Sequence, residues 1–263
     1  CIHYCMSLVK TQSLTSYDLL KTFAVVFMVI DHIGSYFFHD VLWFRSVGRI
    51  EVPVWFFLVG YSNSRNIPTN LWVGAILLII GDRIAGRPVF PLNNLVSIIY
   101  IRLVIDYVMA FLMRHPVLFW PVNAVMLALF LWPEMACEYG VIGLIMAMFG
   151  WVMRRKDQAF AVKGLSVASY GVFSFTAFVA TQALIFQFQG PELNFMVAGT
   201  GAVMFYLWRF FKPCEFVLPA GGLSRCFARA CQFMGRHTLE IYVIHLLMFK
   251  ITNIFLNKTE FFH

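Results

Sequence analysis

The sequence contains few charged residues. Only 13 % of its 263 residues are Asp, Glu, Lys or Arg, whereas a soluble domain typically has about 25 %. Apolar residues make up 60 % of the chain, and the mean hydropathy is +0.76. A soluble protein of this length could not bury so many apolar side chains in one core. These values exclude soluble, disordered and secreted disulfide-scaffold proteins, and they predict an integral membrane protein.

Several motifs of well-known enzyme classes are also absent. The chain has no Walker A sequence, dinucleotide fingerprint, HExxH or GxSxG. Its cysteines form no CxxC pair and have no metal-ligand spacing, so we expect reduced or lipid-facing thiols and no metal site. These cysteines are Cys1, Cys5, Cys137, Cys214, Cys226 and Cys231. The net charge of +7 does not indicate nucleic-acid binding, because the basic residues lie in short loops between apolar runs.

The chain does contain a series of long apolar runs. The runs are continuous rather than alternating, which favours transmembrane helices over a barrel. We predict an all-α polytopic integral membrane protein, with roughly nine transmembrane helices in one bundle and a single domain over residues 1–263. Residues 1–17 are expected to form a short cytoplasmic segment, and residues 213–232 a long loop that could lie along the membrane surface. The expected helices cover residues 19–38, 50–64, 70–86, 93–113, 117–132, 139–153, 164–188, 193–211 and 233–256.

The loop charges predict an orientation. Lys and Arg gather in the loops after the second, fourth, sixth and eighth expected helices. The loops after the fifth and seventh contain acidic residues and no Lys or Arg. The positive-inside rule then places the basic loops and the N-terminus in the cytoplasm. Four arginines fall on the opposite side, which indicates either a structural or catalytic role or a miscounted span. They are Arg45, Arg49, Arg83 and Arg87.

Two polar residues, Asp31 and His32, interrupt the first apolar run. Charged groups at membrane depth are costly and mark candidate sites. Histidine is the side chain best suited to take up a proton near neutral pH. Neighbouring helix residues point about 100° apart, so we expect Asp31 to face a different helix rather than the ring of His32. The alternative is a packing pair that is bonded to another helix.

Two basic residues at helix ends are candidate anion ligands. Arg49 could bind a phosphate or carboxylate with two parallel hydrogen bonds, or it could pair with Glu51 or Asp31. Glu51 is expected to be the partner of Arg49 or Arg45. Arg65 could belong to an anion-binding helix end or be a basic flank that sets topology.

Two further helices carry polar groups in apolar surroundings. Arg102 and Asp106 lie four residues apart on one face and are expected to form an ion pair. His245 lies deep in the last expected helix and shares a face with Tyr242, three residues earlier. His245 could handle a proton or be a hydrogen-bonded core residue.

Several segments together resemble one membrane-protein family. They are DLLKTFAVVFMVIDHIG (18–34), VGRIEVPVWFFLVGYSNSRN (47–66), PLNNL (91–95), EYGVIGLIM (138–146) and IYVIHLL (241–247). Their order and spacing resemble the TraX family, which is named for the enzyme that acetylates the N-terminus of F-type conjugative pilin. The resemblance covers roughly residues 18–247. Glu51 departs from it, because an apolar or small residue is usual at that position.

The resemblance implies a membrane acyltransferase that uses acetyl-CoA as co-substrate. We expect His32 to be the general base, with His245 as a second candidate or as part of an acyl-histidine relay. Asp31 would orient the acceptor or hold an ammonium group. The residues expected to contact acetyl-CoA are Arg49, Asn93, Tyr139 and Arg65.

The resemblance also suggests the surroundings of the reaction. The protein would be a multi-pass protein of the bacterial inner membrane, in contact with the lipid bilayer. The acceptor would be a protein N-terminus, such as that of a pilin, or an envelope glycan or lipid. Two other readings stay open. Asp31, His32, Asp106 and His245 could form the relay of a proton-coupled transporter, although we find no inverted repeat. The chain could also be a non-catalytic assembly subunit.

Overall fold

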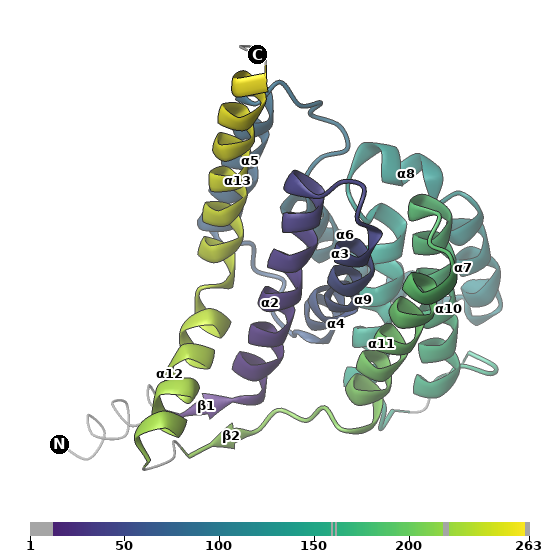
Figure 1. The fold of residues 1–263 in the computed structure, drawn as a ribbon. Helices are drawn as coiled ribbons and strands as arrows, with labels where there is room; N and C mark the ends of the chain where they lie inside the picture. The colour runs from purple at the N-terminus through teal and green to yellow at the C-terminus, as the bar shows by residue number, and fades with distance from the viewer. Residues whose placement is uncertain (1–12, 159, 161, 218–220, 261–263) are drawn as a thin grey trace.

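A computed structural model describes residues 13–158, 160, 162–217 and 221–260 (Figure 1). Residues 1–12, with Cys1 and Cys5, lie outside the described part, and so does most of the expected N-terminal segment. Two short 3₁₀ helices, η1 (Arg49–Glu51) and η2 (Pro116–Leu118), accompany the α-helices. The α-helices are α2 (Ser16–Phe37), α3 (Leu42–Gly48), α4 (Val52–Tyr61), α5 (Thr69–Ile84), α6 (Asn94–Arg114), α7 (Phe119–Ala128), α8 (Leu131–Ala136), α9 (Gly140–Arg154), α10 (Val167–Phe186), α11 (Gly190–Arg209), α12 (Gly222–Arg236) and α13 (Thr238–Glu260).

The mostly helical fold is confirmed, but the number of spans is not. Within the described residues, four segments are long and apolar enough to cross a membrane: α2, α6, α10 and Thr238–Leu256 of α13. The apolar helix α9 has only 15 residues and α5 has 16, whereas a span needs about 20. The four long apolar helices indicate a membrane protein, and nine spans are not confirmed.

Most of the expected helices occur within a few residues of their expected bounds, and the short helix α3 was not expected. The expected helix at 117–132 is divided among η2, α7 and α8. The expected loop at 213–232 was wrong over most of its length, because it contains the greater part of α12. A short strand, β2 (Glu215–Phe216), precedes α12 and pairs antiparallel with β1 (Leu14–Thr15).

The start of α2 is fixed by local hydrogen bonds. The Thr15 hydroxyl accepts from the Asp18 amide, and the Asp18 carboxylate accepts from the Thr15 amide, which together form a capping box. The Ser16 amide also donates to the Cys214 carbonyl across the β1–β2 pair. These bonds set the position of the helix that carries Asp31 and His32.

A tightened turn joins α3 to α4. Pro53 has no amide hydrogen and cannot donate to the Arg49 carbonyl, so the Val52 amide bonds that carbonyl instead and forms the 3₁₀ turn η1. The three pieces cover residues 42–61, which is the length of a membrane span. Arg49 and Glu51 are therefore buried at a break within an otherwise helical segment.

Close packing of α4 on α9 holds this broken segment in place. A side chain at Gly60 would collide with the Ala147 carbonyl, and one at Gly150 would collide with the Phe57 carbonyl. Small residues allow two helix backbones to approach this closely. Nearly every residue of α9 is buried, so this helix forms the centre of the larger hydrophobic cluster.

The other long helices are arranged on either side of α2. Figure 1 shows α5 and α13 side by side, with α2 between them and the group that contains α4, α9, α10 and α11. A second hydrophobic cluster joins α2, α5, α6 and α13. The single-domain organisation stays a prediction.

Candidate functional site: two cavities that meet beside a histidine pair

A polar cavity of about 380 Å³ lies among α2, η1, α5, α10 and α13. We call it the histidine cavity. The lining brings together five of the residues predicted from sequence: Asp31, His32, Arg49, Asn93 and Tyr139. These five residues come from four separate segments of the chain and line the same cavity. Their catalytic and binding roles stay predictions.

A direct hydrogen bond joins the two predicted histidines. His32 Nδ1 lies 2.7 Å from His245 Nε2, and the rings are nearly parallel with centroids 5.0 Å apart. His245 Nδ1 lies 2.6 Å from the Ile241 carbonyl oxygen. A carbonyl can only accept, so His245 Nδ1 carries the hydrogen and, in the neutral ring, His245 Nε2 is an acceptor. His32 Nδ1 must then donate, which leaves His32 Nε2 as the unprotonated nitrogen.

This arrangement suits His32 to the work of a base. A proton taken up at His32 Nε2 would leave the Nδ1 bond to His245 intact. The resulting imidazolium would be stabilised by that charge-assisted hydrogen bond. Tyr242 lies against both rings, with centroids 5.7 Å from His32 and 6.0 Å from His245.

Asp31 is held by two arginines rather than by His32. Its Oδ2 lies 2.7 Å from Arg45 Nη1, and its Oδ1 lies 3.4 Å from Arg49 Nε. The expected pairing of Glu51 with one of these arginines was wrong, because the ion pairs within 4 Å among the described residues join both arginines to Asp31. The Arg49 guanidinium also lies over the rings of Phe186 and Tyr139, at 4.4 and 5.3 Å from their centroids.

Backbone contacts organise the wall near α6 and α9. The Asn93 side chain caps α6 by accepting from the Leu95 amide, and it donates to the Ala75 carbonyl. Both ends of its amide therefore bind protein. Glu138 accepts from the Asn94 amide. Burial raises the pKa of the Glu138 carboxyl above its ordinary value, although the positive charges of Arg49 and Arg45 oppose this shift.

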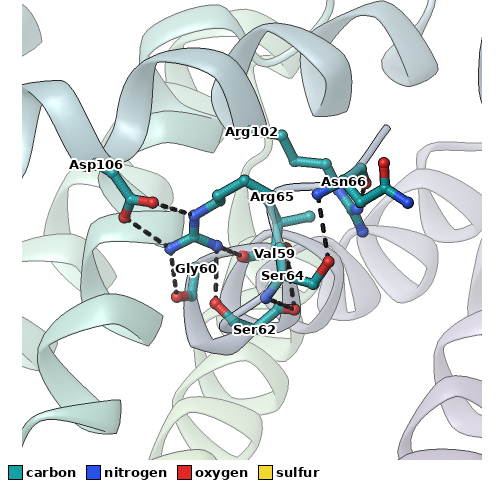
Figure 2. A network of polar contacts seen from close by, with 8 residues as sticks. All are labelled: Val59, Gly60, Ser62, Ser64, Arg65, Asn66, Arg102 and Asp106. Atoms are coloured by element: carbon teal, nitrogen blue, oxygen red, sulfur yellow. Dashed lines mark hydrogen bonds and ion pairs between the residues drawn. The ribbon is translucent and has the colours of Figure 1, made fainter. Parts of the chain in front are cut away.

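Arg65 lies apart from this group and does not line the histidine cavity. Its Nε and Nη2 bind both oxygens of Asp106 at 2.9 and 3.1 Å. Its Nη1 donates to the Val59 and Ser62 carbonyls, and Nη2 also donates to Gly60 (Figure 2). All five donors are thus directed to protein acceptors, at the end of α4 and on Asp106 of α6.

The expected pair of Arg102 with Asp106 is replaced by this clamp. Asp106 pairs with Arg65, and Arg102 Nη1 donates to the Asn66 carbonyl at 2.6 Å (Figure 2). A carboxylate with two oxygens fits the fork of one guanidinium, so Arg65 satisfies Asp106 with two parallel bonds.

A second cavity, of about 490 Å³, lies toward the opposite ends of the helices. We call it the basic cavity. Its charged lining residues are Lys21, Arg102 and Arg154, and the described part of its lining contains no carboxylate. Ser62, Asn63 and Asn70 add polar groups. The surplus of positive charge favours an anionic ligand.

The two cavities share three lining residues: Met28, Asn94 and Tyr242. Tyr242 is also the residue that packs on both histidines. A ligand in the basic cavity could therefore extend toward the histidine pair with little displacement of the protein.

Sequence reasoning missed several members of this site. Lys21 and Arg154 resembled the ordinary basic residues that flank membrane helices and set their orientation. Nothing in the local sequence distinguished them from such residues. Asp82 and Lys250 line the histidine cavity and form an ion pair of 2.8 Å between α5 and α13. Asp82 lies in the predicted 70–86 helix and Lys250 in the predicted 233–256 helix. Because isolated charges in apolar runs mark candidate sites, their positions could have indicated this pair.

Sequence comparison identifies the family to which this chain belongs. A sequence model described as TraX protein matches residues 16–253. The chain belongs to the TraX protein family. It is 28 % identical over 150 residues to protein TraX of Escherichia coli, which covers 54 % of this chain and 58 % of that protein. It is also 37 % identical over 92 residues to an uncharacterized protein of Rickettsia prowazekii (strain Madrid E), which covers 35 % of this chain and 37 % of that protein.

The chain therefore spans between about a third and three-fifths of the length of these two curated relatives. No solved structure matches it. The family assignment confirms the resemblance drawn from the motifs. The matched range includes the described lining residues of each cavity.

Proposed function

We propose that this protein is a membrane acyltransferase that moves the acetyl group of acetyl-CoA to an amine or hydroxyl acceptor. One observation carries the proposal: a cavity whose described lining has only positive charges meets a cavity beside a hydrogen-bonded histidine pair, at Met28, Asn94 and Tyr242. Acetyl-CoA has an anionic phosphate end and an uncharged thioester end. The basic cavity would suit the phosphate end, and the histidine cavity would suit the thioester end.

The donor would bind through its phosphates in the basic cavity. Lys21, Arg102 and Arg154 would supply the positive charge, and the three residues that the cavities share would border the thioester. This role replaces the anion-binding role predicted for Arg65, whose donors already bind protein. Arg49 and Tyr139 line the other cavity, where Arg49 would face the acceptor rather than the phosphates.

The chemical step needs a base near the thioester. His32 Nε2 would take the proton from the acceptor amine or hydroxyl as that atom forms its bond to the acetyl carbon. The carbon–sulfur bond then breaks, and the proton passes from His32 to the departing thiolate, which gives free CoA and the acetylated acceptor. His245 would hold the His32 ring in the orientation that leaves Nε2 unprotonated. An acyl-histidine route through the same nitrogen is the alternative.

The acceptor would enter the histidine cavity. Glu51 and Glu138 line this space and lack an arginine partner within ion-pair distance, while Asp31 binds Arg45 and Arg49. Unpaired carboxylates suit an acceptor that arrives as an ammonium, such as a protein N-terminus. One carboxylate would take the first proton, which leaves the neutral amine that attacks the acetyl carbon. A pilin N-terminus or an envelope glycan or lipid at the bacterial inner membrane fits this role, with the N-terminus of the enzyme in the cytoplasm.

The test is release of free thiol from acetyl-CoA by the purified protein in detergent. Wild type should release thiol slowly, with water as the acceptor, and His32→Ala should reduce this rate by at least about 100-fold. His237→Ala is the matched control, because His237 is about half exposed at the start of α13. Equal rates for wild type and a folded His32→Ala would contradict the proposed base. Absence of thiol release and of acetyl-CoA binding by wild type would contradict the enzyme itself.

A second candidate is favoured by the same meeting of cavities. Two polar cavities that extend toward opposite helix ends could also form a proton pathway, with Asp31, His32 and His245 as relay groups. Proton flux into proteoliposomes that depends on His32, together with no thiol release, would favour this transporter over the acyltransferase.

A further inference from the structure

The helix α12 has three distinct faces. Ala228, Cys231 and Gly235 are buried, and they lie three and then four residues apart on the face that packs against α2. Along this face, the Thr22 hydroxyl donates to the Cys231 carbonyl at 2.9 Å, and a side chain at Gly235 would collide with Asp18. This face is therefore occupied by the protein.

The second face of α12 is apolar and exposed. Leu223, Phe227 and Ala230 follow at spacings of four and three residues, which places them on one stripe of a helix. Leu223 is 88 % exposed and Phe227 is 66 % exposed. Large apolar side chains that project this far from a protein need an apolar medium or a partner.

The third face is basic. Arg225, Arg229 and Arg236 follow at spacings of four and seven residues, so they form a stripe roughly opposite Leu223 and Phe227, and all three are exposed. Within α12, the described residues include no acidic side chain. Strong separation of arginines from aromatic and aliphatic residues is typical of helices that lie in a membrane interface.

The place of α12 in the fold supports the same reading. The helix ends one residue before α13, whose segment Thr238–Leu256 is long and apolar enough to cross a membrane. It also packs on the first turns of α2, another such helix. Figure 1 shows α12 at the end of the molecule where α2 begins. A helix at the joined ends of two spanning helices lies at the height of the lipid headgroups.

We propose that α12 is an interfacial helix that binds anionic phospholipids. Leu223 and Phe227 would insert among the acyl chains, and Arg225 and Arg229 would bind headgroup phosphates of the leaflet on the side where α2 begins. Opposite charge selects this occupant, because a zwitterionic surface would offer the arginines far less electrostatic attraction. The proposal is independent of any catalytic activity.

The test compares amide hydrogen exchange of the full chain in two kinds of nanodisc. One holds phosphatidylcholine alone and the other includes about 30 % phosphatidylglycerol. An arginine near an anionic surface contributes about fivefold to binding, so the α12 amides of wild type should exchange about 10-fold more slowly with phosphatidylglycerol. Added salt at 0.5 M should remove most of this slowing.

Charge variants provide the controls. The double substitution Arg225→Gln with Arg229→Gln should reduce the lipid effect to less than about twofold, whereas Arg225→Lys with Arg229→Lys should keep most of it. Arg114→Gln with Lys156→Gln removes the same charge from exposed positions at the end of α6 and just after α9, and should leave the effect unchanged. Unchanged exchange in the α6 amides would show that each variant is folded.

Three outcomes would overturn the proposal. Equal α12 exchange of wild type in the two lipid mixtures would exclude anionic lipid as the ligand. A phosphatidylglycerol effect that survives the Arg→Gln substitutions would exclude the arginines. Protection that appears only in discs with two copies of the chain would assign the apolar face to a second copy instead.

Discussion

The two cavities differ in how their charges are balanced. The histidine cavity is lined by four carboxylates and four cations, and most of these are joined in ion pairs, such as Asp31 with Arg45 and Lys250 with Asp82. The basic cavity has three cations and no carboxylate among its described lining residues. Paired charges at membrane depth maintain the shape of a site, whereas unpaired cations attract a ligand of opposite charge. The comparison therefore assigns shape and proton transfer to one cavity and anion binding to the other.

Breaking the paired charges should have the largest effect. Asp31→Asn would leave the buried Arg49 and the partly buried Arg45 without their carboxylate, which costs about 3 kcal/mol or more. We expect a clear fall in the melting temperature measured by thermal unfolding in detergent. Asp106→Asn is the matched control with a smaller expected effect, because that carboxylate is about half exposed. A fall of equal size in both variants would contradict the special role of the buried group.

Removing the histidine bond should reduce turnover without emptying the donor site. His245→Leu would remove the acceptor of the His32 Nδ1 hydrogen bond and the stabilisation of the imidazolium. A hydrogen bond to a charged group corresponds to a loss of roughly 10- to 100-fold in kcat. The KM for acetyl-CoA should stay within about twofold, and the pH profile of kcat should shift. A loss confined to KM would place His245 in donor binding instead.

Neutralising a charge in the basic cavity should raise KM for acetyl-CoA rather than lower kcat. Arg102→Gln and Lys21→Gln should each raise the KM for acetyl-CoA about 10-fold, because each removes one charged contact to phosphate, and kcat at saturation should change little. Arg114→Gln, an exposed basic residue away from both cavities, is the matched control. Steady-state thiol release measures all three variants. An unchanged KM in both cavity variants would exclude this cavity as the phosphate site.

The smallest expected effect is a pH-dependent difference in stability at Glu138. Its folded pKa is raised by burial, so its contribution to stability is present below its ordinary pKa of about 4.3 and is lost as pH rises through the folded value. Glu138→Gln removes this loss while keeping an acceptor for the Asn94 amide. The melting temperature of the variant relative to wild type should therefore increase between about pH 4 and pH 7. A constant difference would show that the carboxyl titrates normally.

The sequence could predict most helices and the convergence of the histidines. Apolar runs locate spanning helices because burial in lipid requires them, and Asp31, His32 and His245 are conspicuous in such runs. The helix α12 could not be found in this way, since its charged and apolar residues average to low hydropathy, Gly221 precedes it and Gly222 is its first residue. Only the helical spacing of its buried, apolar and basic residues indicates this helix.

The charge pairs were harder to predict than the residues that form them. Arg102 and Asp106 have ideal spacing within one helix, but Arg65 reaches Asp106 from a loop and offers two bonds at once. Glu51 lies two residues from Arg49, but the turn of η1 directs Arg49 toward Asp31 of α2. Sequence spacing describes local neighbours, and it says little about which distant helix competes for the same group.

The most direct test of the account measures binding and turnover on the same samples. Acetyl-CoA would be titrated against wild type, His32→Gln and Arg102→Gln in one detergent, with the dissociation constant and thiol release both recorded. We expect His32→Gln to bind acetyl-CoA like wild type but to lose turnover by about 100-fold or more. Arg102→Gln should bind about 10-fold more weakly and keep its turnover at saturation. Parallel losses of binding and turnover in both variants would contradict the division of labour between the two cavities.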